Sequence, residues 1–247
     1  MNIGIAGPMG AGKTTVAERL EAEHGYVRMS LATPLRYLST LLLGRAIDKK
    51  VDRAVLQRVG GAARSPAWRG IDTPYEPARR ERVDALAHHL FPEAPPERIE
   101  ALYRALYQEG YAYGWGDPNY WLTRWRRDFL RQTKPVVVDD LRFPIEGDWL
   151  GRCGFFLAFL EVPLAERQRR IIQRDGAWDP AWSLDATEAL VDDIPIHCKV
   201  DGTGAPERVE SAVLMQALEW SQRRFTASDR AGMLKAQAAG SRQGNNG

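Results

Sequence analysis

The sequence is short of the residues that most often build metal sites and disulfide frameworks. Only two of its 247 residues are cysteines, Cys153 and Cys198. They stand far apart without CxxC spacing, which excludes a cysteine zinc site or a disulfide scaffold and suits a reducing cytosol. The four histidines show no ligand spacing. The net charge of +2 gives no electrostatic reason to expect nucleic acid or a membrane as the partner.

Long apolar runs are missing as well. No run approaches the roughly 20 residues of a membrane span, and the first residues lack the basic segment and apolar core of a signal peptide. Hydrophobic residues still make up 44% of the chain, which is enough to build an ordinary core. We therefore expect a cytoplasmic protein of one large domain or two small ones.

The first 25 residues predict a strand, a glycine-rich loop and a helix in that order. Ile3 and Ile5 belong to a short buried strand, and residues 13–24 form a helix that ends at Gly25. This order opens α/β nucleotide-binding folds.

Strand and helix patterns then divide the rest of the chain. Apolar residues at helical spacing predict a helical region over 36–133, and strand patterns return after it. From about residue 226 the sequence is small and polar, and we expect a tail without fixed structure. The expected domain is thus 1–225, with a core of 1–35 and 134–225. Further strands are predicted within 26–31, 134–143, 154–162 and 194–202, and further helices within 83–90, 99–106, 120–132, 163–176 and 205–225.

The loop after the first strand has a phosphate-binding pattern. It matches G-x-x-x-x-G-K-[ST] at every fixed position, with a strand before it and a helix after it. Glycines let backbone N–H groups turn around a phosphate, the lysine reaches the β- and γ-phosphates of ATP, and the threonine hydroxyl helps hold Mg²⁺. A turn that only closes a strand-helix junction does not account for pattern and context together. The predicted ATP-binding residues are Gly7, Gly10, Ala11, Gly12, Lys13, Thr14 and Thr15.

A second part of the site is expected where a run of three valines ends. Asp139 and Asp140 follow this buried strand, where a carboxylate that organises Mg²⁺ belongs. Because neighbouring residues of a strand point to opposite sides, one of the two is expected to face the metal. The alternative is that they cap the strand or pair with Arg142.

Arginines in two other places suit an anionic ligand. Arg167, Arg170 and Arg174 share one face of a predicted helix, and phosphoryl transfer needs such cations. A solvated helix surface is the alternative. Arg36 follows the second strand and is a candidate for the phosphate of an acceptor, with an exposed helix-start arginine as the other interpretation.

The aromatic and basic residues over 120–132 could also suggest nucleic-acid binding. However, Leu122, Trp125 and Phe129 share one helix face and the arginines mostly occupy the other. A helix that packs on a core with a solvated basic side is the better account, and we expect no nucleic-acid partner.

Taken together, these segments resemble a known family, the deoxynucleoside monophosphate kinases of tailed bacteriophages, within the nucleoside monophosphate kinase group of P-loop kinases. The resemblance extends to about Arg208, and the ordered set is more specific than the loop alone. The animal-type phosphomevalonate kinases are similar too. The segments that carry the resemblance are "GIAGPMGAGKTTVAERL", "SLATPLR", "VLQRVGG", "GDPNYWLTRW", "VVVDDLRFPIEGDWL" and "DATEALVDDIPIHCKVDGT".

The resemblance implies an α/β P-loop kinase fold with a five-stranded parallel sheet, a helical acceptor-binding insertion and a lid at about 175–192. It implies transfer of the γ-phosphoryl of ATP to a nucleoside monophosphate, with Mg²⁺, in the host cytoplasm, and it is compatible with a homodimer. Arg36 and Arg142 would hold the acceptor phosphate. Gln57, Arg58 and Trp121 would lie near the acceptor, and Arg167 and Arg170 would act beside the lid.

Two departures from the family pattern bear on these implications. The segment 61–116 matches weakly, so the resemblance does not specify which nucleoside monophosphate is the acceptor. The histidine-serine-glutamate run expected before the last strand is replaced by "LDATE", so the resemblance implies no lid role for Thr187 and Glu188.

Other functions stay open at this point. One is a P-loop kinase for another small phosphorylated acceptor, such as phosphomevalonate or dephospho-coenzyme A, although the latter usually has an acidic residue where this chain has "MSLATP". A P-loop ATPase acting on nucleic acid is less favoured by the charge. A P-loop binding protein without catalysis is weakened by the intact lysine, threonine and aspartates.

Overall fold

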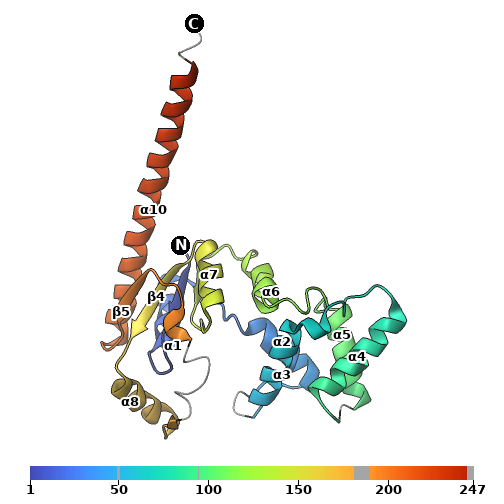
Figure 1. Ribbon diagram of the computed structural model, residues 1–247. Coiled ribbons are helices and arrows are strands. Elements are labelled where there is room, and N and C mark those ends of the chain that lie inside the picture. Colours follow the sequence, from blue (N-terminus) through green and yellow to red (C-terminus); the bar gives the residue numbers. More distant parts are fainter. Residues whose placement is uncertain (49–50, 94, 181–189, 244–247) are drawn as a thin grey trace. The chain divides into compact units, whose positions relative to one another are not determined.

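The computed structural model divides the chain into two compact units (Figure 1). Unit 1 comprises Met1–Met29 and Thr133–Gly247, and unit 2 comprises Ser30–Gln132. The structure describes the chain except for residues 49–50, 94, 181–189 and 244–247, and it describes side chains as far as residue 224.

Unit 1 is built on a parallel sheet of five strands in the order β2-β3-β1-β4-β5. The central strand β1 aligns Ile3 with Val137 of β3 on one side and with Phe156 of β4 on the other. The sheet is flanked by helices, so the predicted α/β fold with a five-stranded parallel sheet is confirmed. The strands are β1 (Ile3–Ala6), β2 (Val27–Arg28), β3 (Val136–Val138), β4 (Phe156–Glu161) and β5 (Cys198–Asp201).

The two faces of this sheet pack against different helices. Helices α1 (Lys13–His24) and α10 (Pro206–Gln243) share one hydrophobic cluster with alternate strand residues such as Ile5 and Ala158. On the opposite face, Leu157 lies against Gly4 and Gly151, the latter on α7 (Pro144–Arg152). The helices that follow β1 and β3 therefore cover opposite faces, which makes the carboxyl ends of these two strands a switch point where ligands bind in such sheets.

Two further helical elements complete unit 1. Helix α8 (Leu164–Asp175) follows β4, and a short helix, η3 (Val191–Asp193), precedes β5. Buried Glu210 of α10 accepts a hydrogen bond from Arg19 and contacts His24, both on α1, which ties these two helices together.

The last helix differs from the sequence-based expectation. We expected a tail without fixed structure from residue 226, whereas α10 extends to Gln243. The segment 226–243 is rich in alanine and other strong helix formers, and this local preference outweighed the polar composition on which the expectation rested.

Unit 2 is helical. Its core gathers apolar residues from each α-helix described in this unit, among them Leu38, Val59, Leu86, Leu102 and Trp121. The predicted periodicities over 83–90 and 99–106 are confirmed, because Val83, Leu86, Leu102 and Leu106 are all buried. The elements are α2 (Thr33–Leu43), α3 (Arg53–Arg64), η1 (Pro66–Trp68), α4 (Glu76–Leu90), α5 (Pro96–Tyr107) and α6 (Tyr120–Phe129).

Helix α6 supports the core-packing interpretation of its aromatic residues. Trp125 and Leu122 are buried, and the Trp125 ring stacks on Phe129 with 5.1 Å between the ring centroids. Arg126 and Arg127 are exposed on the other side. No helix within the described part of the chain is long and apolar enough to cross a membrane.

Candidate phosphate-binding site

The glycine-rich loop adopts a backbone conformation that side chains rarely allow. Gly7, Gly10 and Gly12 have φ values of +140°, +82° and +94° between β1 and α1. Residues with a Cβ atom are strained in this region, so glycine is required to turn the loop. These turns bring the chain from the centre of the sheet to the first turn of α1.

Two of these glycines are also needed for close packing. A Cβ atom on Gly7 would lie 2.9 Å from the carbonyl oxygen of Leu160 on β4. A Cβ atom on Gly10 would lie 2.9 Å from the carbonyl oxygen of Arg167 and 3.0 Å from the side chain of Ile171, both on α8. The loop is therefore pressed against α8, and Gly10, which is not a fixed position of the sequence pattern, is constrained as strongly as Gly7.

The N-terminus of α1 is suited to an anion. Its N-cap is Gly12, and no side chain caps the helix. The first backbone N–H groups of a helix lack partners within the helix and carry the positive end of the helix dipole. A phosphate placed in the loop would meet these groups directly.

Lys13 lies over the same loop. Its Nζ donates hydrogen bonds to the carbonyl oxygens of Gly7 at 2.5 Å and Pro8 at 3.0 Å. A lysine that reaches back over the loop in this way can exchange the carbonyls for phosphate oxygens without a large movement. Thr14 and Thr15 follow on α1 and are exposed, so their hydroxyl groups can be reached from solvent.

Two arginines of α8 contact the loop from the side of β4 and β5. Arg167 donates to the carbonyl oxygen of Val162 at 3.2 Å and of Met9 at 3.4 Å. Arg170 donates to Ala11 at 3.4 Å and to Gly202, beyond β5, at 2.8 Å. Both are half-buried. The structure thus brings the two predicted arginines to the glycine-rich loop, where their hydrogen bonds hold loop carbonyls.

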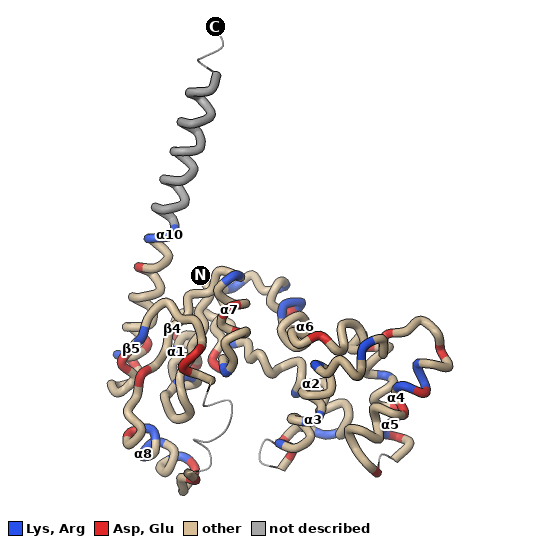
Figure 2. The backbone as a smooth tube through the Cα atoms, viewed as in Figure 1, with Lys and Arg blue, Asp and Glu red and all other residues tan. Residues whose placement is uncertain are grey.

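The third arginine of that helix face points elsewhere. Arg174 forms an ion pair with Asp175 at 2.6 Å and is exposed. Acidic and basic residues are interleaved along α8 (Figure 2), and Glu166 pairs with Arg169 and Arg170. Hydrogen bonds from these two arginines lower the pKa of Glu166 to about 2. Much of the positive charge of α8 is therefore balanced on the helix itself.

Asp139 and Asp140 lie at the switch point beside the loop. The parallel register aligns Gly4 with Val138, so both aspartates follow β3 beside the last residues of β1. Asp139 is buried and Asp140 is half-buried. The pKa of Arg28 on β2 is raised mainly by its hydrogen bond to Glu18, and the charge of Asp139 adds to the rise. Asp139 therefore lies close enough to the Arg28 guanidinium for the two opposite charges to interact.

The segment after these aspartates is held by Glu146. One oxygen of Glu146, Oε2, accepts hydrogen bonds from the backbone N–H groups of Arg142 at 2.7 Å and Phe143 at 3.1 Å. Burial raises the pKa of Glu146 to about 7, and the charge of Asp140 adds to the rise. Arg142 itself is exposed, beyond the carboxyl end of β3.

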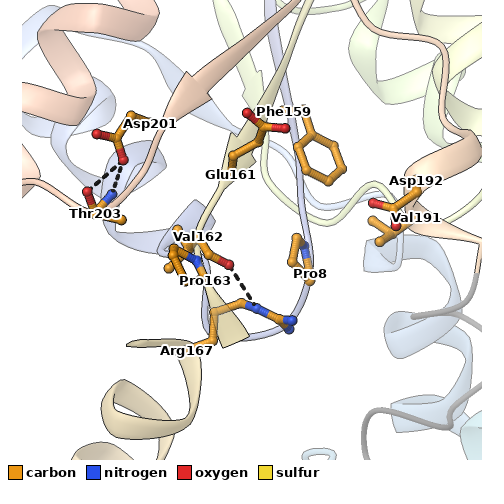
Figure 3. Close-up of a pocket in the computed structure, with 10 residues that line it drawn as sticks. All are labelled: Pro8, Phe159, Glu161, Val162, Pro163, Arg167, Val191, Asp192, Asp201 and Thr203. Atoms are coloured by element: carbon orange, nitrogen blue, oxygen red, sulfur yellow. Dashed lines mark hydrogen bonds between the residues drawn. The ribbon is translucent and has the colours of Figure 1, made fainter. Parts of the chain in front are cut away.

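A pocket of about 700 Å³ opens beside the loop at the carboxyl ends of β4 and β5 (Figure 3). Figure 3 shows Pro8 of the loop and Arg167 of α8 on its wall, with Asp201 holding Thr203 through two hydrogen bonds. Glu161 and Asp192 also line it. Its size would suit a small organic ligand. Within the described residues, no cluster of three or more histidine, cysteine or acidic side chains is placed to hold a metal ion.

The candidate acceptor residues Arg36, Gln57, Arg58 and Trp121 belong to unit 2. Gln57 and Arg58 are exposed on α3, Arg36 is half-buried on α2, and Trp121 of α6 is buried, with its indole N–H donating to Gly60 at 3.1 Å. Gly60 also lies against Leu35, so α2, α3 and α6 meet around it. The four residues thus come from three helices that share one contact point, and Trp121 packs in the core.

Other sequence-based predictions fall partly or wholly outside these observations. Of the predicted lid at 175–192, residues 181–189, including Thr187 and Glu188, lie outside the described residues. Glu146 and Gly202 were not predicted as part of the site. Proline at the first helical position and glutamate at the third are a helix-start signal that could have indicated Glu146.

Comparisons with known proteins add little to this geometry. No protein-family model matches the sequence, and no characterised protein matches it significantly. A gluconokinase from Sinorhizobium meliloti aligns at 17% identity over 92% of this chain and 97% of that one, with a TM-score of 0.47. A shikimate kinase from Aquifex aeolicus aligns at 14% identity over 90% and 98%, with a TM-score of 0.42. Likenesses this weak give no information on the substrate of this chain.

Proposed function

We propose that this chain is an ATP-dependent kinase that phosphorylates a ribo- or deoxyribonucleoside monophosphate to the diphosphate. The observation that supports it most is the glycine-rich loop, which joins the central strand to the uncapped N-terminus of α1 and is held by two arginines. Backbone N–H groups, a helix N-terminus and nearby cations together suit a polyphosphate. The choice of acceptor rests on the resemblance of the ordered sequence motifs.

In this proposal the loop forms the donor half of the site. Residues 7–15 would hold the phosphates of ATP, and Lys13 would exchange the carbonyls of Gly7 and Pro8 for phosphate oxygens. Thr14 and one of Asp139 and Asp140 would hold Mg²⁺, since hydroxyl and carboxylate oxygens are ligands it prefers. Bound Mg²⁺ supplies neutralisation of the charge on the phosphate oxygens.

Arginines form the acceptor half. In unit 1, Arg142 follows Asp140 beyond the carboxyl end of β3. Arg36 lies in the first turn of α2 in unit 2, and its assignment to the acceptor rests on the sequence resemblance alone. A guanidinium can grip a phosphate through two parallel hydrogen bonds. The attacking oxygen of a nucleoside monophosphate is already anionic at neutral pH, so no protein base is needed and the residues act by positioning and charge neutralisation.

A panel of acceptors tests the proposal. The purified protein is incubated with ATP and Mg²⁺ and each of the ribo- and deoxyribonucleoside monophosphates, and ADP is measured. Parallel reactions contain phosphomevalonate, dephospho-coenzyme A or nucleic acid instead of the monophosphate. We expect ADP with at least one monophosphate and little without it. If ADP forms only with phosphomevalonate or dephospho-coenzyme A, the protein is a kinase for that acceptor and not for a nucleoside monophosphate. If nucleic acid stimulates ATP hydrolysis and no small acceptor is phosphorylated, the kinase proposal is wrong.

Two variants separate the donor and acceptor halves. Arg142→Ala should raise the acceptor KM by about ten- to a hundredfold, because the charge-assisted hydrogen bonds from the guanidinium to the acceptor phosphate are lost. ATP binding in the absence of acceptor should stay unchanged. Lys13→Ala should lower turnover by orders of magnitude in a folded protein. Arg152→Ala is the matched control, because Arg152 is an exposed arginine on the adjoining helix that pairs with Asp148. If Arg142→Ala loses ATP binding but keeps a normal acceptor KM, the assignment of Arg142 to the acceptor half of the site is wrong.

A further inference from the structure

Glu146 holds the start of the segment that carries the proposed acceptor arginine. It stands at the third position of α7, and its Oε2 reaches back to the N–H groups of Arg142 and Phe143 at 2.7 and 3.1 Å. Phe143 is the N-cap of the helix, with an extended backbone at φ −125°. Both donors precede the first helical residue, Pro144, so neither N–H group belongs to the backbone hydrogen-bond ladder of α7.

The same glutamate lies close enough to Asp140 and Arg142 to feel the charges of both side chains. The charges of Asp140 and Arg142 both act on it, in opposite directions. Only three residues, 141–143, separate Asp140 from Pro144, where the helix begins. One side chain that holds two successive backbone N–H groups removes much of the freedom of this short connection.

We propose that Glu146 is a positioning residue that fixes the backbone at Arg142 and Phe143 and so sets where the Arg142 guanidinium is presented to the acceptor. It touches neither the acceptor nor ATP. The expected effect of Glu146 on kinetics rests on the proposed kinase function. The two hydrogen bonds that fix the backbone do not depend on that function.

Both hydrogen bonds go to a single oxygen, Oε2. Two substitutions of Glu146 can therefore separate the effect of these bonds from the effect of the negative charge. In Glu146→Gln the amide oxygen can accept both N–H groups, so position is kept while the carboxylate is removed. In Glu146→Ala both bonds are lost. Asp148→Ala is the control, because Asp148 is an exposed carboxylate on the same helix that pairs only with Arg152 among the described residues.

Kinetics provide the first test. We expect Glu146→Ala to raise the acceptor KM, or lower kcat, by about ten- to a hundredfold, since a typical hydrogen bond is worth up to about tenfold, with ATP binding in the absence of acceptor unchanged. Glu146→Gln should recover most of this loss, and Asp148→Ala should behave as the wild type. A folded Glu146→Ala with normal acceptor kinetics, or a Glu146→Gln as damaged as Glu146→Ala, would overturn the proposal.

Amide hydrogen exchange provides a test that needs no activity. The N–H groups of Arg142 and Phe143 should be protected in the wild type and in Glu146→Gln, and should exchange faster in Glu146→Ala. If no nucleoside monophosphate is an acceptor but this pattern holds, the proposed function fails and the backbone role of Glu146 stands. If exchange at these two amides is equal in all variants, the positioning role is wrong even in an active kinase.

Discussion

Replacing Gly10 by alanine should damage the glycine-rich loop in a way that the structure quantifies. Gly10 has φ +82°, and a residue with a Cβ atom pays about 1–2 kcal/mol there. The added Cβ would also lie 2.9 Å from the carbonyl oxygen of Arg167 and 3.0 Å from Ile171. Overpacking of this kind costs about 1–3 kcal/mol. Together the substitution should lower the free energy of unfolding by about 2–5 kcal/mol.

Gly25 is the matched control for this substitution. It has φ +69° at the end of α1, and a Cβ there would meet nothing within 4 Å. Gly25→Ala should therefore cost only the backbone strain, about 1–2 kcal/mol. Urea unfolding followed by circular dichroism measures both free energies, and calorimetry measures ATP binding, which only Gly10→Ala should weaken. Equal losses of stability and equal ATP affinities in the two variants would refute the packing of the loop against α8.

Two further predictions concern the aspartates that follow β3 and the histidine that directly precedes β5. Asp→Asn at whichever of Asp139 and Asp140 organises Mg²⁺ should reduce both the rate and its Mg²⁺ dependence, with a milder effect at the other position; small, equal effects would make both structural. The Nδ1 atom of His197 accepts a hydrogen bond from the Leu157 N–H at 2.8 Å. Burial, assisted by the charge of Arg224, lowers the pKa of His197. Since its folded pKa lies below its unfolded value of about 6.5, its contribution to stability is complete above that pH and is lost as the pH falls through the folded pKa. His197→Asn should lessen the loss of stability on acidification in thermal unfolding, and an unchanged pH profile would contradict this.

Local sequence patterns determined most elements of the fold. The strand, loop and helix over residues 3–24 follow from apolar spacing, glycine and the helix end at Gly25, and all three form as predicted. The buried valines of β3 and the periodic helices α4 and α5 also follow from local spacing, because burial imposes a period that can be read in one dimension. Composition was a poorer guide, since α10 passes residue 226 on the strength of its helix formers.

Only the tertiary structure decided which of these residues meet. The sequence placed Arg167, Arg170 and Arg174 on one helix face, but α8 brings only the first two against the loop carbonyls, while Arg174 turns to Asp175. Gly10 owes its constraint to a helix more than 150 residues away in the sequence, and no local pattern can reveal a contact of that separation. The phosphate-binding pattern of the loop is thus determined by consecutive residues of the sequence. The contacts that hold the loop in place depend on how strands and helices pack around it.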